Sequence, residues 1–216
     1  MHKYNKEVYS NLRTGDIILF CSSYTGLYGI IDSTLKYFTN SQYTHIGFVI
    51  KEKKLGYKNL DINKTYLWES GYEPIPDPTD NKVKYGVQLT DLEKLLKKYK
   101  NGNIYVRKLN CSNEECARIF NFKKLEPIQH TVYGKPYDYN IFDWLLAIDR
   151  FDLNPQKIDR FWCSAFTGYI LTKCDILREN TDWSILRPSD FSIEDKNKHL
   201  EYKTNIKFEN KQYKLL

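Results

Sequence analysis

Residues 41–50 read SQYTHIGFVI, a polar run that passes into an apolar one at His45. The β-branched and aromatic residues of the second half are typical of a β-strand, so the imidazole is expected where loop meets strand. Strand ends border clefts, which makes His45 a candidate general base; the alternative is a histidine with a structural role. The other histidines are weaker candidates. His2 is terminal, His130 lies in a predicted loop without apolar residues to pack against, and His199 lies in a charged stretch.

Similar patterns on both sides of this stretch predict a central sheet. Strands are expected at residues 16–20, 45–50, 65–69, 85–89 and 104–109, and a weakly signalled hairpin at 205–216 turns near Asn210. The prolines within residues 71–82 exclude both a helix and a central strand, so this segment is predicted to be a surface loop.

Helices are expected between and after these strands. The spacing of apolar residues favours a short helix at 28–38, and a capping box of Thr90 and Glu93 predicts another. A second capping box, Ser112 with Glu115, predicts a helix that ends near Pro127. Residues 161–173 are largely apolar and long enough for a further, buried helix. Strands with segregated helices predict an α+β fold in which an antiparallel sheet packs on the last of these helices.

The composition indicates one domain over residues 1–216, since 41% of the chain is hydrophobic and a sizeable core can form without metals or cross-links. The five cysteines have neither Cys-x-x-Cys pairing nor a dense regular spacing, so we expect no metal, no cofactor and no disulfide framework. A reducing, cytoplasmic location fits this pattern. The first residues contain no apolar signal segment, and no run approaches the roughly 20 apolar residues that span a bilayer.

The net charge of +6 comes from lysines that are spread along the chain rather than gathered in one block. We therefore expect a solvated basic surface, with peripheral contact to an anionic membrane as the alternative. No helix-turn-helix, zinc or aromatic-basic motif is present, so no nucleic-acid partner is expected.

Cys163 is a candidate nucleophile because RFWCSAF, residues 160–166, places it at the start of the predicted buried helix. The free amides and the dipole of a helix N-terminus favour a thiolate and can receive an oxyanion. The alternative is a cysteine that only packs in the core. Glu69 ends a predicted strand beside Trp68, where a buried carboxylate requires a partner such as an imidazole; a solvent-facing glutamate is the alternative.

Six short motifs in the chain resemble those of the permuted papain-like enzymes of the NlpC superfamily, which include bacterial YiiX-type hydrolases, the lecithin:retinol acyltransferase group and a poxvirus-encoded branch. The motifs are TGDIIL at 14–19, THIG at 44–47, WES at 68–70, GKPYDY at 134–139, WCS at 162–164 and LRPSD at 186–190. Histidine precedes cysteine here, whereas cysteine comes first in papain, and this order implies a circularly permuted papain-like fold.

The resemblance also implies the roles of particular residues. Cys163 is expected to be the nucleophile, His45 its base and Glu69 the carboxylate that orients the base. The cleft is expected to include Asp16, Tyr137 and Ser164, although Asp16 could equally cap a turn and Tyr137 could be a core residue. The chain departs from bacterial members at Ala165, where a glutamate is common, and in two stretches without a counterpart, residues 71–82 and 141–159, which we expect to shape the cleft.

The expected function is therefore that of a cysteine hydrolase acting on an amide or ester bond of a small molecule, a peptide or a lipid through an acyl-enzyme. An acyltransferase that uses the same intermediate is one alternative. A non-catalytic binding or virion protein that retains the fold is another, although such a protein would be expected to lose one of the three polar residues.

Overall fold

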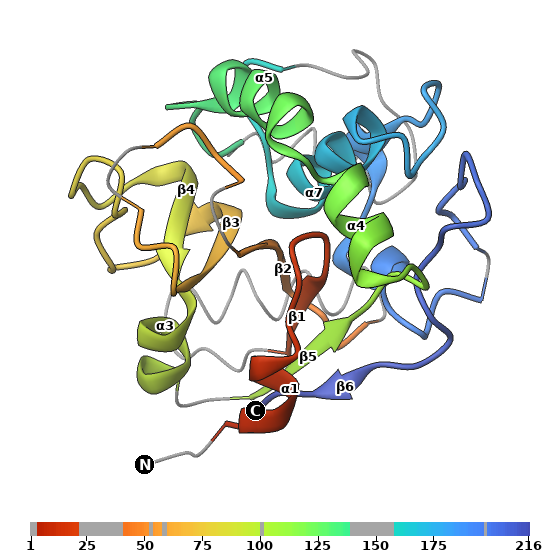
Figure 1. Cartoon of the computed structure of the whole chain (residues 1–216), viewed down its shortest axis with the longest axis horizontal. Helices are drawn as coiled ribbons and strands as arrows, with labels where there is room; N and C mark the ends of the chain where they lie inside the picture. The colour runs from red at the N-terminus through yellow and green to blue at the C-terminus, as the bar shows by residue number, and fades with distance from the viewer. Residues whose placement is uncertain are drawn as a thin grey trace.

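A six-stranded antiparallel sheet forms the centre of the protein in the computed structural model (Figure 1), with strand order β4-β3-β2-β1-β5-β6. The structure describes residues 4–21, 41–51, 54–57, 60–99, 102–138, 158–196 and 198–216. The strands are β1 (Ile17–Cys21), β2 (His45–Lys51), β3 (Thr65–Tyr72), β4 (Tyr85–Asp91), β5 (Asn103–Arg107) and β6 (Tyr213–Lys214). The predicted α+β class is confirmed, while the helix expected at 28–38 lies outside the described residues.

Helix α7 (Cys163–Lys173) covers one face of the sheet. Its residues from Cys163 to Thr172 are all buried, as expected of a helix that is apolar on every side. The ring of Phe166 meets the edge of Trp68 on β3, with 5.2 Å between the ring centroids. Helices α4 (Asn113–Ile119) and α5 (Phe122–Val132) complete this layer, and Figure 1 shows α5 beside α7.

The opposite face is covered by α3 (Leu92–Lys98), with α1 (Lys6–Ser10) nearby (Figure 1). Successive side chains of each strand point to opposite faces of the sheet. In β1, Ile17 and Leu19 pack in the core under α7, whereas Ile18 and Phe20 pack in the core under α3. Near the ends of the chain, the Asn5 amide donates to the Leu215 carbonyl at 2.8 Å. Two short 3₁₀ turns, η1 (Trp183–Ile185) and η2 (Pro188–Phe191), follow α7.

Several predicted element boundaries are wrong. Helix α3 is capped by Asp91, which accepts a hydrogen bond from the Lys94 amide, while Thr90 belongs to β4. Pro127 lies inside α5 because a new helix starts at the Asn121 cap instead of the first helix running on to the proline. The expected turn near Asn210 does not make a hairpin, since β6 pairs with β5.

The loop at residues 71–82 is only partly a surface feature. Pro74 and Pro76 are exposed, but Ile75 packs into the core under α3. Asp77 is buried as well: its carboxylate accepts from the Leu89 amide at 3.0 Å and pairs with Lys84 at 2.7 Å. These contacts hold the loop against the outer strand β4.

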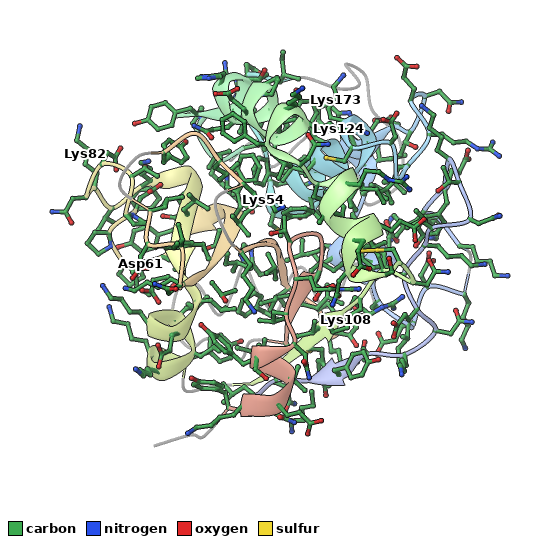
Figure 2. All side chains as sticks on the ribbon, viewed as in Figure 1. Lys54, Asp61, Lys82, Lys108, Lys124 and Lys173 are labelled. Carbon is green, nitrogen blue, oxygen red and sulfur yellow. A yellow bond between two sulfur atoms is a disulfide. The ribbon has the colours of Figure 1, made fainter. Side chains whose placement is uncertain are left out.

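A disulfide joins Cys111 to Cys116, next to α4 (Figure 2). The sequence predicts no disulfide framework, and this single cross-link is local: the start of α4, where Ser112 is the N-cap, brings the two Cα atoms to 5.8 Å. The free cysteines among the described residues are Cys21, Cys163 and Cys174, all of them buried.

Candidate active site

A chain of three polar side chains lies across strands β2, β3 and β4. The Nε2 atom of His45 is 2.6 Å from Oε2 of Glu69, and the Thr90 hydroxyl donates to Oε1 of Glu69 at 2.6 Å. Glu69 and Thr90 are fully buried, whereas the side chain of His45 is 24% exposed. The Nε2 atom of the imidazole is therefore held by a buried carboxylate, while part of the ring is exposed to solvent.

The strand register explains this convergence. Thr90 pairs with Leu67, two residues from Glu69, so both polar side chains point to the same face of the sheet. Both oxygens of the carboxylate have a hydrogen-bond partner, which makes its burial tolerable. Glu69 thus serves as a fixed acceptor for the imidazole.

Gly71 leaves the space that the imidazole occupies. A Cβ atom at this position would lie 3.1 Å from Cε1 of His45, closer than ordinary van der Waals contact. On another side, the ring of Phe20 packs against the imidazole with 5.4 Å between the centroids. The ring is therefore confined by neighbours as well as by its hydrogen bond.

Cys163 is the first residue of α7 and is 5% exposed. No side chain caps this helix at Trp162, so its first-turn amides are not used by a cap. Burial alone would lower the pKa of His45, but the charge and hydrogen bond of the Cys163 side chain, followed by those of Glu69, raise that pKa well above 6.5.

The environment of Cys163 therefore differs from that of Cys174 at the other end of α7. Burial raises the pKa of the Cys174 thiol to about 12, so this cysteine stays protonated near neutral pH. Cys163 instead lies at a helix N-terminus and interacts with the imidazole of His45. The structure places His45 in contact with Glu69 and close enough to Cys163 for that side chain to affect the pKa of the imidazole.

Two hydrogen bonds fix the start of α7. The Ser70 hydroxyl donates to the Phe161 carbonyl at 2.6 Å, which ties β3 to the residues before the helix. The Ser164 hydroxyl donates to the Leu186 carbonyl at 2.7 Å. Ser164 is thus buried and bonded to the backbone, which gives its hydroxyl a structural task instead of the expected place in the cleft.

Asp16 is not part of this cluster. It precedes β1, whereas Phe20, which contacts His45, lies four residues further on, about 13 Å along an extended strand. The buried carboxylate pairs with Lys108 at 2.7 Å and accepts from the Arg13 amide at 2.9 Å. Burial raises the pKa of Asp16, and Lys108 and Arg13 oppose that effect. These bonds fit the alternative that Asp16 caps a turn.

Tyr137 lies beside the segment that leads to the nucleophile. It forms a β-bridge with Phe161, and its amide donates to the Tyr85 carbonyl at 3.2 Å. The side chain is half-buried. Tyr137 therefore stays a cleft candidate, at one edge of the site.

Two residues beside Glu69 escaped the sequence analysis. Gln88 pairs directly with Glu69 across β3 and β4, and among the described residues neither atom of its buried amide has a hydrogen-bond partner. Glu73 follows the end of β3. Burial raises the pKa of its carboxyl to about 7, Glu69 adds to this rise, and His45 and Lys98 oppose it. A charged residue that closely follows a predicted catalytic strand was the signal that could have revealed Glu73.

One group among the described residues has the composition of a metal site. Ligand atoms of Asp190, Asp195 and His199 lie within 4.8 Å of one another. Nδ1 of His199 is 2.6 Å from Asp195 and 3.4 Å from Asp190, so the imidazole already bridges the two carboxylates.

A scan against protein-family models and a search of curated proteins found no match to this chain. None of the helices in the described ranges has the length and apolar character that a bilayer crossing requires. The side chains of Cys163, His45 and Glu69 nevertheless form a defined arrangement. It offers a nucleophilic sulfur, a proton carrier and a buried carboxylate in contact with that carrier.

Proposed function

We propose that the protein is a cysteine hydrolase in which Cys163 attacks an amide or ester carbonyl, His45 carries the proton and Glu69 orients the imidazole. The observation that carries the proposal is the position of the imidazole, held by Glu69 at 2.6 Å and interacting with the Cys163 side chain. A nucleophile, a base and a group that orients the base are the parts that covalent acyl chemistry requires.

The reaction begins when the sulfur of Cys163 forms a bond to the carbonyl carbon and the carbonyl π electrons move to the oxygen. The first-turn amides of α7, which no side-chain cap uses, would stabilise this oxyanion. As the intermediate collapses, the carbon–nitrogen or carbon–oxygen bond breaks and the imidazolium of His45 protonates the leaving group. A thioester remains on Cys163.

Release of the acyl group uses the same residues in reverse. Neutral His45 takes a proton from water, the resulting hydroxide attacks the thioester, and the thiolate leaves. Glu69 stabilises the imidazolium at both stages, and Thr90 keeps that carboxylate in place. If the acyl group passed to an acceptor other than water, the same residues would catalyse acyl transfer. The identity of the acceptor therefore distinguishes a hydrolase from an acyltransferase.

The order of the residues and the antiparallel sheet packed on α7 support membership of the permuted papain-like enzymes of the NlpC superfamily, which we propose as the family. The substrate classes that follow from this proposal are peptide or amino-acid amides and lipid esters or amides. Contact with a membrane surface would accompany a lipid substrate.

Mass spectrometry of the intact protein after exposure to a panel of activated esters and amides tests the proposal. An acyl adduct that maps to Cys163, is lost in Cys163→Ala and decays with time in water is the expected result. Decay that accelerates with added amines or alcohols would identify a transferase. A protein that is folded but forms no adduct with any member of the panel would instead favour the non-catalytic binding role.

A further inference from the structure

Glu73 lies next to the proposed catalytic residues and has no evident structural task. It comes two residues after Gly71, the residue that makes room for His45, and this spacing corresponds to about 7 Å of extended chain. The carboxyl is close enough to Glu69 and His45 to feel the charge of both. Glu73 is thus within reach of a substrate whose carbonyl lies between His45 and Cys163.

No described residue forms a hydrogen bond or an ion pair with the carboxyl of Glu73. Lys98 is the nearby cation, but its ammonium group is exposed and donates to the Pro74 carbonyl at 3.4 Å. Opposite Glu69, on β4, the buried amide of Gln88 also lacks a hydrogen-bond partner among the described residues. Most partly buried polar groups are hydrogen-bonded, so two unused ones beside Glu69 indicate capacity for a polar ligand.

The charge of the site favours one kind of ligand. Burial is the main reason that the pKa of Glu73 rises to about 7, and the neighbouring carboxylate of Glu69 adds to this rise. An anionic ligand would be repelled by the carboxyl of Glu73, whereas an ammonium or guanidinium group would give this partly buried carboxyl a partner of opposite charge. Partly buried charges of opposite sign attract more strongly than exposed ones, because water screens them less.

We propose that Glu73 is a specificity-determining residue that binds a positively charged group of the substrate, an amine or a guanidinium, close to the bond that Cys163 attacks. This proposal rests on the proposed function and names the substrate class of the same site. It predicts amides or esters that carry a cationic group within a few bonds of the scissile carbonyl. Negatively charged analogues should be disfavoured.

Three methanethiosulfonates of similar size and different charge test this preference: the 2-aminoethyl, 2-hydroxyethyl and 2-sulfonatoethyl reagents. In each case the thiolate of Cys163 attacks the sulfenyl sulfur, a mixed disulfide forms and methanesulfinate leaves. The rates are measured by mass spectrometry with peptide mapping at pH 7.5, and Cys163→Ala identifies the signal. The ratio of the cationic to the neutral rate cancels the thiolate fraction and reports the local charge.

The wild-type ratio should exceed that of Glu73→Gln by about tenfold, the effect of one carboxylate near the reacting sulfur. Glu201→Gln, which removes an exposed carboxylate paired with Arg178 at 3.5 Å, is the matched control and should leave the ratio unchanged. Equal ratios in the wild type and Glu73→Gln would overturn the proposal.

A second measurement needs no variant at Glu73. In the wild type alone the same ratio should rise between pH 5.5 and pH 8 as Glu73 ionises, and a flat ratio would overturn the proposal. Failure of the proposed function looks different: Cys163 would form no acyl adduct with the ester panel, while the charge ratio of the methanethiosulfonates would still be measurable.

Discussion

Replacing Glu73 with glutamine removes one negative charge from beside Glu69 and His45 while it keeps the shape of the side chain. The pKa of Glu73 is about 7 in the folded protein, against 4.5 without the fold. Each pKa unit corresponds to about 1.36 kcal/mol, so ionised Glu73 destabilises the folded state by about 2–3 kcal/mol after allowance for its partial exposure. Glu73→Gln should therefore be more stable than the wild type at alkaline pH.

The pH dependence gives the sign of the effect. Below about pH 4.5 the carboxyl is protonated in both the folded and the unfolded chain, and the variant should gain little. Between pH 4.5 and 7 the folded protein binds the proton more tightly than the unfolded chain, so wild-type stability falls as the pH rises. Above pH 7 the difference should be constant at its full value.

Urea unfolding at pH 4.5, 6 and 8.5 measures this difference directly. A gain of 2–3 kcal/mol also corresponds to roughly 4–12 °C in the melting temperature of a chain this long. Glu201→Gln serves as the control, because its exposed carboxylate should show no such trend. A stability gain for Glu73→Gln that is independent of pH, or larger at acidic pH, would refute the reasoning.

The other predictions concern the imidazole and its partners. Gly71→Ala places a methyl group 3.1 Å from Cε1 of His45, so alkylation of Cys163 by iodoacetamide should slow by about tenfold while the melting temperature stays within a few degrees. Thr90→Val removes a buried donor to Glu69 and should lower the unfolding free energy by about 1.5–3 kcal/mol in urea titrations. Cys163→Ala should abolish acyl-enzyme formation, and His45→Ala should nearly abolish it. Glu69→Gln should retain a measurable rate of acylation that is lower than the wild-type rate by a factor of up to about 10⁴. Single-turnover rates with an ester that acylates the wild type rank these three.

The location of the catalytic candidates was largely readable from local sequence. A polar run that passes into an apolar strand placed His45 at a strand end, and an apolar stretch of helical length placed Cys163 at a helix start. These are properties of a few consecutive residues, and the hydrophobic pattern carries them. The contact of His45 with Glu69 followed from assigning both residues to neighbouring strands.

The partners of these residues were not readable in the same way, because strand register depends on pairs that lie far apart in sequence. Thr90 matched a helix cap locally, yet its place opposite Leu67 turns it toward Glu69. Asp16 lies in a motif of the resemblance, but the pairing of β1 with β5 brings Lys108 to it and makes it structural.

Glu69 and its neighbours Glu73 and Gln88 differ in what they contribute to the stability of the fold. A protein can bury a carboxylate at little expense when both of its oxygens are bonded, as Thr90 and His45 do for Glu69. It gains nothing in stability from the ionised carboxyl of Glu73, which burial and the Glu69 carboxylate both disfavour, or from the buried amide of Gln88, which has no hydrogen-bond partner in the described part of the chain. Local violations of this kind collect at functional sites, where binding a ligand compensates for them. If Glu73 binds a cationic substrate, the bound cation offsets both the burial and the repulsion that disfavour the ionised carboxyl in the empty protein, so the same carboxyl lowers stability and provides affinity.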